Sequence, residues 1–317
     1  MVRTGSFQYL KYGWETAPGT ENATRTKIFG KEQKMGALSF KTNVQALREM
    51  DTIEVGSFGF MGNEGNATLN WVLSNPWFFR GLFASPVKAG TAPTTYTYDS
   101  SVSAAKIIST MSIEAGYDAE TQDLVRVLLG VIFSNCTISC KVGDFVRVSA
   151  GIQWGKEKAI GTTVASGVAE DSGSSFPFTF VHGALAVDGV TLSQVQSADI
   201  TFTMNSDLLR EINTADATDG YRKGFDITGK FQVSQVDKTY VQKVMDRAEI
   251  SSTPDLVLTF SNGLAGASMK KIVITCTGLA LGEHDNNVEP VEAIFENVSW
   301  QIRNVVVVAS NQTTTEP

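Results

Sequence analysis

The chain has 317 residues, of which 42% are hydrophobic and 19% charged, so it can bury a large core and wholesale disorder is not expected. Its formal charge of −7 argues against a protein that grips nucleic-acid phosphates, although it does not exclude one that must avoid gripping them. No run approaches about 18 apolar residues and the N-terminus lacks a signal-peptide core, so neither a membrane span nor classical secretion is expected.

The N-terminal part of the chain shows few signs of an independent core. Residues 1–35 contain a Pro-Gly pair among alternating polar residues, and we interpret them as an N-terminal arm. Residues 36–155 follow as a first β module, because segments rich in β-branched and aromatic residues are separated there by turn residues. Within this module, Ala67–Asn75 is read as a short helix that Pro76 stops.

The second half of the chain begins after a segment of low aromatic content. Residues 156–175 are rich in Gly, Ser, Thr and Ala and are predicted to form a flexible linker. Residues 176–310 read as a second β module, with a helix near 237–249 where a stripe of valine and methionine follows a capping aspartate. The polar residues 311–317 are expected to form a disordered tail.

The dominant hydrophobic period is two residues, which is the period of a strand with one buried and one solvated face. In the segment ADITFTMNS, Ile200, Phe202 and Met204 alternate with polar residues, and FDITGKFQV from Phe225 follows the same pattern. The predicted fold class is therefore mainly β, with duplicated β-sandwich or barrel modules and one or two accessory α-helices.

A weak internal similarity supports the duplication. The segment from Arg48, which contains DTIEVGSFGF, resembles RKGFDITGKFQV from Arg222, and a predicted helix follows each of them. Two related β modules explain this similarity better than one continuous domain.

Residues able to perform metal or thiol chemistry are scarce. The three cysteines, Cys136, Cys140 and Cys276, form no CxxC motif and are read as buried free thiols. His284 lies beside Asp285, a pair that could mark a metal site, but a solvated loop is the preferred interpretation. We therefore expect no cofactor and no metal site.

Catalytic motifs are missing from suitable contexts, because the chain has no GxSxG, HExxH or phosphate-binding loop of the required form. The acidic groups around Asp118, Asp216 and Glu289 could serve glycoside hydrolysis, but solvated turns explain all three. The sequence therefore predicts that the protein is not an enzyme.

Large aromatic residues are concentrated in the segment NPWFFRGLF, which begins at Asn75. Aromatic residues are enriched both in cores and at protein interfaces, so this segment is either core or a contact surface. Both interpretations stay open from the sequence. The candidates for a subunit interface are Trp77, Phe78, Phe79 and Phe83.

The order of these segments resembles that of the tail tube proteins of tailed viruses, over residues 36–305. IEVGSFGF followed by NATLNWVLSNPWFFRGLF is similar to the strand-then-helix unit of that family, and GVIFSNCTISCKVGDFVRVSAGIQWGKEKA is similar to its hairpin. The resemblance implies a structural virion protein whose rings, of six subunits or a pseudo-hexamer of duplicated domains, stack into a tube. Inner strands of all subunits would form one β-barrel around a channel for genome ejection.

The resemblance also gives the polar strand faces a role. A lumen without net positive charge lets a polyanion pass without sticking, and Lys230 is the one candidate that departs from this rule. The predicted lumen residues are Asp199, Thr201, Thr203, Asp226, Thr228, Lys230 and Gln232.

Partners and location follow from the same resemblance. The expected partners are other copies of the chain, a tape-measure protein and DNA that pass through the lumen without specific binding, the tail terminator, baseplate or tip proteins and, in some tails, a sheath. The protein would be made in the host cytoplasm and reside in the virion tail. Two alternatives remain open: another virion β protein, such as a decoration or terminator protein, or a carbohydrate-binding, adhesin-like β-sandwich that displays the aromatic segment.

Overall fold

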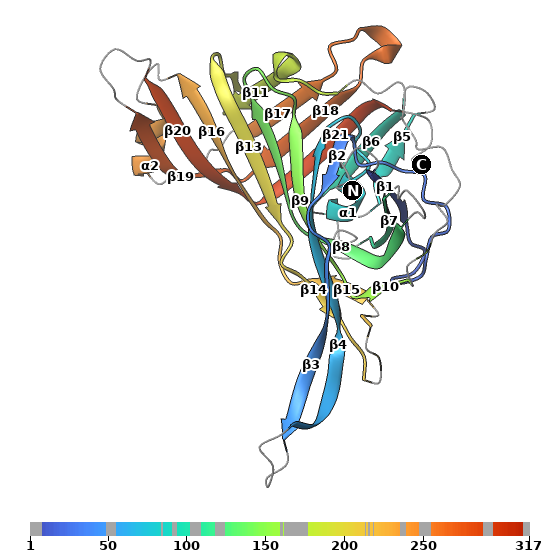
Figure 1. Ribbon diagram of the computed structural model, residues 1–317. Coiled ribbons are helices and arrows are strands. Elements are labelled where there is room, and N and C mark those ends of the chain that lie inside the picture. Colours follow the sequence, from blue (N-terminus) through green and yellow to red (C-terminus); the bar gives the residue numbers. More distant parts are fainter. Residues whose placement is uncertain are drawn as a thin grey trace, which may run out of the picture.

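The computed structural model describes residues 8–48, 55–83, 85–90, 94–101, 109–117, 124–158, 161, 177–212, 214, 216–217, 219–234, 239–246, 255–287 and 294–312. Its largest sheet has 12 antiparallel strands, of which eight follow one another in the order β19-β20-β16-β13-β8-β9-β4-β2 (Figure 1). The other four pair alongside this path. The strands are β1 Gln8–Trp14, β2 Lys31–Met35, β3 Ser39–Arg48, β4 Val55–Val72, β7 Met111–Tyr117, β8 Leu124–Lys141, β9 Arg147–Trp154, β10 Lys156–Glu157, β13 Val195–Thr203, β16 Asp226–Ser234, β19 Ala280–Asn287 and β20 Phe295–Ile302.

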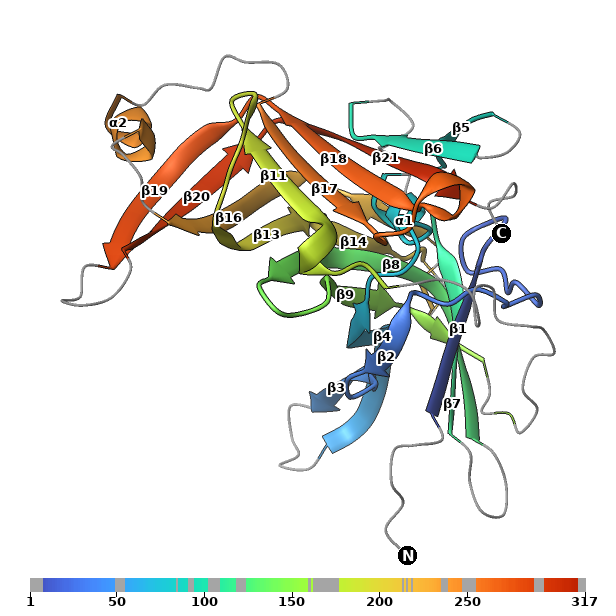
Figure 2. The ribbon, with the colours of Figure 1, turned by 90° about the horizontal axis from the view of Figure 1, so that it is seen from above.

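A second sheet of seven strands lies over the large one, and the core fills the space between the two layers (Figure 2). Its strand order is β12-β11-β17-β18-β21-β6-β5, and a two-stranded sheet, β14-β15, lies apart from it. The described part of the chain contains no closed barrel. The remaining elements are β5 Val87–Ala89, β6 Thr94–Asp99, β11 Gly183–Val187, β12 Val190–Thr191, β14 Ser206–Leu209, β15 Asp219–Arg222, β17 Leu256–Ser261, β18 Lys271–Thr277, β21 Asn304–Gln312, the helices α1 Phe79–Phe83 and α2 Thr239–Asp246, and the 3-10 turns Phe180–His182 and Gly266–Ser268.

Alternating burial explains why the central segments form strands. In β13, Ala198, Ile200 and Phe202 are buried against the second sheet, while the residues between them face the other side. Because successive side chains of a strand point to opposite faces, one apolar row per strand is enough to build the core. This confirms the predicted mainly β fold with a packed, sandwich-like core.

The segment Ala67–Asn75, read as a helix from the sequence, belongs to a strand. Residues up to Val72 form the end of β4, with Leu69 and Trp71 buried and Asn70 exposed between them. Pairing with β9 on one side and β2 on the other satisfies the backbone, so the tertiary partners decide the conformation. The first half of β4 continues beyond the sheet and pairs with β3 in a long hairpin that projects from the body (Figure 1).

The helix expected near 237–249 is present as α2, which packs Tyr240 against Phe231 of β16 with ring centroids 5.4 Å apart. The second helix, α1, lies in the aromatic segment, nearer the C-terminus than the expected one. The two α-helices of the described residues agree with the predicted one or two accessory helices, but only α2 occupies a predicted position.

The strand order repeats within the large sheet. Four strands that precede residue 155 lie in the order β2-β4-β9-β8, and four that follow residue 176 lie in the order β13-β16-β20-β19. Numbered along the chain within each group, both orders read first, second, fourth, third. The two groups meet where β8 pairs with β13. This repeated order matches the duplication inferred from the sequence.

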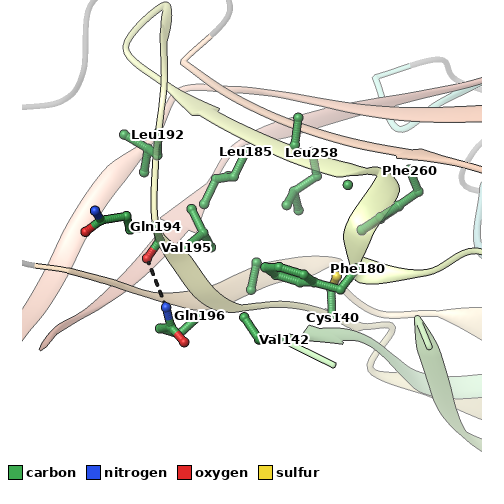
Figure 3. A pocket seen from close by; sticks show the side chains of 13 residues that line it. Cys140, Val142, Phe180, Leu185, Leu192, Gln194, Val195, Gln196, Leu258 and Phe260 are labelled. Atoms are coloured by element: carbon green, nitrogen blue, oxygen red, sulfur yellow. Dashed lines mark hydrogen bonds between the residues drawn. The ribbon is translucent and has the colours of Figure 1, made fainter. Parts of the chain in front are cut away.

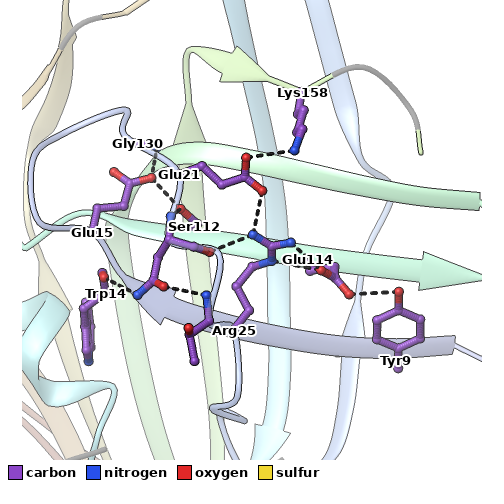
Figure 4. A network of polar contacts seen from close by, with 11 residues as sticks. Tyr9, Trp14, Glu15, Glu21, Arg25, Ser112, Glu114, Gly130 and Lys158 are labelled. Atoms are coloured by element: carbon purple, nitrogen blue, oxygen red, sulfur yellow. Dashed lines mark hydrogen bonds and ion pairs between the residues drawn. The ribbon is translucent and has the colours of Figure 1, made fainter. Parts of the chain in front are cut away.

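The N-terminal residues are held to the large sheet by a buried polar network (Figure 4). Arg25 approaches the fully buried carboxylate of Glu114 in β7 through Nε and Nη2, at 2.9 and 2.7 Å. Tyr9 donates its hydroxyl proton to the same carboxylate at 3.0 Å. Glu21 bridges Arg25 and Lys158, each at 2.9 Å. These contacts join the N-terminal residues to β7 of the large sheet and to Lys158.

Candidate functional site: the polar face of the large sheet

The seven predicted lumen residues share one face of the large sheet, opposite the core. Three lie on β13 and four on the neighbouring β16, and the strand register pairs them directly. Thr201 lies opposite Thr228, Asp199 opposite Lys230, and Thr203 opposite Asp226, while Gln232 lies opposite Ser197. The structure therefore brings these side chains together, but the position of this face in an assembly stays a prediction.

A row of uncharged side chains crosses the sheet at the level of Thr201. The hydroxyl groups of Thr137 and Thr201 hydrogen bond to each other at 3.0 Å, joining β8 to β13. Continuing through the paired positions on either side, the row consists of Gln301, Thr228, Thr201, Thr137, Ser149 and Asn70. Four of these six residues were not named from the sequence, although alternation in the segments NCTISCK and FENVSWQI would have found Thr137 and Gln301.

The neighbouring row alternates in charge. It runs through Arg147, Ser139, Asp199, Lys230, Ser299 and Glu283, so two cations and two anions are interleaved. Lys230 Nζ lies 3.7 Å from Asp199 Oδ2 and its side chain is 69% exposed. Exposed pairs of this kind contribute at most about 1 kcal/mol to stability. Their main effect is to cancel charge, which resolves the apparent exception of Lys230 on this face.

Two further acidic groups at this face, Asp144 and Asp226, have polar partners. Arg147 donates to Asp144 at 3.0 Å, and this hydrogen bond, with help from the Phe145 backbone amide, lowers the pKa of the Asp144 carboxyl. Asn205 donates to Asp226 at 2.9 Å. Hydroxyl, amide and paired charged groups bind water readily but offer no concentrated positive charge for phosphate. The face is therefore suited to contact with a hydrated polyanion, without tight binding.

Both ends of the large sheet are open edges. Among the described strands, β19 pairs only with β20 at one end, and β2 and β3 pair only with β4 at the other. An open edge presents backbone amide and carbonyl groups that can pair with a further strand. These edges are the parts of the polar sheet that a neighbouring chain can extend.

The aromatic segment is core, and its residues are not displayed to a partner. Trp77, Phe78, Phe79 and Phe83 are 2%, 0%, 0% and 3% exposed within the single chain. Trp77 packs edge-on against Tyr96, with ring centroids 5.1 Å apart, and Phe83 does so against Phe202 at 5.6 Å. The interface expectation is therefore replaced by the core interpretation that the sequence had left open. Because these aromatic side chains are buried, they are not displayed for binding carbohydrate, as the carbohydrate-binding alternative had required.

An apolar cavity of about 370 Å³ lies between the two sheets, near β11 and β13 (Figure 3). Phe180, Leu185 and Leu258 line it from the second sheet side, and Cys140 lines it from β8. Burial, and then the negative charge of Asp199, raise the pKa of the Cys140 thiol to about 12. This thiol is therefore protonated at neutral pH and is not an activated nucleophile.

The other thiols and His284 also have structural positions. Cys136 and Cys276 are buried, and burial raises the pKa of both thiols. His284 is not in a solvated loop, as had been expected, but lies in β19 with its Nε2 atom 2.7 Å from Glu296 Oε2 on β20. In the described residues, no group of three His, Cys, Asp or Glu side chains is arranged to hold a metal ion.

Comparison with known proteins identifies the family of this polar-faced sheet protein. No helix in the described part of the chain is long and apolar enough to cross a membrane. No curated protein matches the sequence. A family model described as phage tail tube protein matches residues 5–302, which is nearly the whole chain. The chain therefore belongs to the phage tail tube protein family and is a structural component of a virion tail.

Proposed function

We propose that this chain assembles with itself into stacked rings that form the tail tube, and that the polar face of the large sheet lines the channel for genome ejection. The observation that carries this proposal is the combination of a charge-balanced polar face with two open edges on the same sheet. Joining edges between copies extends the sheet and removes the exposed strand edges that a single copy presents.

The chemistry of the face suits passage of DNA. A protein that neutralises phosphates with lysine or arginine releases counterions and binds DNA in a salt-dependent way, which would retard a moving strand. The uncharged row through Thr201 offers hydrogen-bonding groups, and the row through Lys230 offers charges of alternating sign. The tape-measure protein would occupy the same channel before DNA, without a specific binding site.

The remaining partners follow from the proposed assembly. A tube needs a terminator at one end and baseplate or tip proteins at the other, and a contractile tail adds a sheath around the outside. The two groups of strands, β2-β4-β9-β8 and β13-β16-β20-β19, would each contribute four strands to the channel wall, and the first group begins at Lys31, before the predicted module boundary at residue 36. The chain would be synthesised in the host cytoplasm and then incorporated into the virion.

Electron microscopy of the purified protein tests this proposal directly. We expect negatively stained tubes with a central channel, formed from the protein alone or after addition of a tail-tip complex that nucleates assembly. Small particles of constant size that never elongate in either condition would contradict the proposal and favour a decoration or terminator role.

A further inference from the structure

We infer that β19 of one copy pairs, antiparallel, with the β2–β3 edge of the next copy, and that this contact repeats the junction between β8 and β13 inside each chain. The inference rests on the proposed self-assembly and specifies which edges meet and in which register. It follows from three observations: the repeated strand order, a repeated glycine–tryptophan contact and the charges of the two edges.

The repeated strand order identifies the two edges. In the order first, second, fourth, third, the outermost strand of the first group is β8 and that of the second group is β19. Inside the chain, β8 joins β13, which is the first strand of the following group. The same rule applied to β19 requires the first strand of another group. No described strand of the same chain pairs with this edge of β19. We therefore infer that the strand beside β19 comes from the first group of another copy.

A glycine–tryptophan contact fixes which residues are equivalent. Gly65 on β4 lies opposite Trp154 on β9, and Gly229 on β16 lies opposite Trp300 on β20. In both pairs a Cβ atom on the glycine would lie 2.1 Å from the indole ring, so the ring covers the glycine. On the other side of each glycine, the neighbouring strand, β3 in the first group and β13 in the second, places an apolar residue opposite it.

Those apolar residues are Phe40 on β3 and Ile200 on β13, and both pack against the core. Since β3 supplies the residue equivalent to Ile200, β2 and β3 together correspond to β13. Their outer edge is therefore the counterpart of the β13 edge that receives β8.

Counting from these anchors transfers the internal register to the contact between copies. Asn135 on β8 lies opposite Thr203 on β13. In the first group, Asn135 faces Gly151, which lies three residues before Trp154. In the second group, Asp285 faces Asn297, which lies three residues before Trp300. Asp285 is therefore the equivalent of Asn135. This gives one side of the contact.

The other side follows from the first strands. Thr203 is three residues after Ile200, and Asn43 is three residues after Phe40. Over these residues both strands pair regularly with the second strand of their group, without a bulge. The transferred register therefore places Asp285 of one copy opposite Asn43 of the next, and both side chains are exposed in the single chain.

Charge complementarity supports the same partner. The strand Ala280–Asn287 carries Glu283 and Asp285 and no lysine or arginine. The edge from Lys31 to Arg48 carries four basic residues, which are Lys31, Lys34, Lys41 and Arg48, against the single acidic residue Glu32. An acidic edge meeting a basic edge favours this pairing over β19 with β19 or the basic edge with itself. In the transferred register Lys41 is a diagonal neighbour of Asp285 across the contact.

Cysteine cross-linking tests the register. The variant Asp285→Cys/Asn43→Cys, oxidised under conditions that give tubes or rings, should form disulfide-linked multimers on a non-reducing gel. Each single variant should give at most a linked pair of chains at background level. The matched control Asp285→Cys/Thr203→Cys places the second thiol on the equivalent position inside the sheet, where β8 already pairs, and should not link copies. The native thiols are buried and do not compete.

The outcomes separate the register from the assembly itself. Multimers from the Asp285/Asn43 variant, with none from the control, support the inferred junction. Tubes that form normally but give no linked multimers from this pair overturn the junction and leave the proposed function standing. A wild-type protein that never assembles overturns both. If Asn43→Cys prevents folding, Lys41→Cys on the same edge replaces it and should link to Asp285→Cys with lower yield.

Discussion

Gly229 lies directly beneath the indole ring of Trp300, and a Cβ atom at this glycine would approach both that ring and the Asp199 carbonyl oxygen, at 2.1 and 2.3 Å. The carbonyl belongs to the backbone of β13 and cannot rotate away. The absence of a side chain at residue 229 is therefore a condition for close pairing of three neighbouring strands.

Gly229→Ala should destabilise the fold by about 1–3 kcal/mol, which is the usual cost of forcing extra atoms into a packed region. The midpoint of denaturant unfolding measures the change. Gly161→Ala is the matched control, because nothing lies within 4 Å of a Cβ atom at that glycine. Equal midpoints for the two variants would contradict the packing described around Trp300.

Positive charge introduced on the polar face should slow the passage of DNA without blocking assembly. Thr201→Lys/Thr228→Lys adds two cations to the uncharged row of each copy, and each cation can hold a phosphate. We expect slower genome ejection from virions carrying the variant, with recovery at high salt. Ejection rates at several salt concentrations provide the measurement.

The control for this prediction places the same charges elsewhere. Val181→Lys/Val190→Lys adds two lysines at positions that are 77% and 63% exposed and lie outside the large sheet. Ejection at the wild-type rate is expected from this control. Equal slowing by both variants would argue that total charge, and not the polar face, governs passage.

The buried pair of Arg25 and Glu114 should matter far more than the exposed pair of Lys158 and Glu21. Arg25→Met leaves the fully buried Glu114 carboxylate without its guanidinium partner, a change that typically costs about 3–5 kcal/mol. Lys158→Met removes a partner that is 57% exposed and should cost about 1 kcal/mol or less. Unfolding free energies from urea titration compare the two, and similar losses would disprove a buried anchor for the N-terminal arm.

Acid should weaken the attachment of the N-terminal arm. The hydrogen bond from Lys158, together with the one from Arg25, lowers the pKa of Glu21 below its usual value of 4.5. A carboxyl whose pKa is lower in the folded protein stabilises it above the unfolded pKa, and this stabilisation is lost as pH falls through the folded pKa. Stability should therefore decline below about pH 4.5, and Glu21→Gln should show a smaller decline. Acid unfolding of the wild type and of Glu21→Gln can be followed by tryptophan fluorescence. Identical unfolding curves would show that Glu21 does not contribute to acid stability.

The three thiols should resist labelling in the native protein. All three are buried, and the high pKa of Cys140, about 12, keeps its thiol protonated at neutral pH. A maleimide should react only after denaturation, while the exposed thiol of Asp285→Cys should react at once. Native Cys140 labelling as fast as that of the engineered cysteine would show that the cavity beside it opens readily.

The polar face was predictable because its signal is local. Alternation over nine residues of β13 assigns each side chain to a face regardless of which strands lie beside it. Thr137 could have been found in the same way. The error at Ala67–Asn75 arose because Leu69, Trp71 and a following proline are also compatible with a helix, and only pairing with β9 resolves the ambiguity.

The aromatic segment could not be assigned by sequence, because its burial depends on distant strands. Tyr96 of β6 covers Trp77, and Phe202 of β13 covers Phe83. The position of His284 could not be predicted for the same reason, because its contact with Glu296 forms only when β19 pairs with β20. The order of strands in the sheet, and therefore its two open edges, likewise depends on contacts between parts of the chain far apart in sequence.

Pairing of β6 with β21 joins Tyr98 to Val307, so the second sheet is completed only by a strand that is synthesised long after β6. Until then the nascent chain lacks the strand that covers one edge of β6, and β19 has also only just been synthesised. Long-range pairing of this kind makes folding slow and exposes strand edges in the meantime. We expect nascent chains to remain unable to polymerise until β21 has been synthesised and has paired with β6, which delays tube growth until the second sheet is complete.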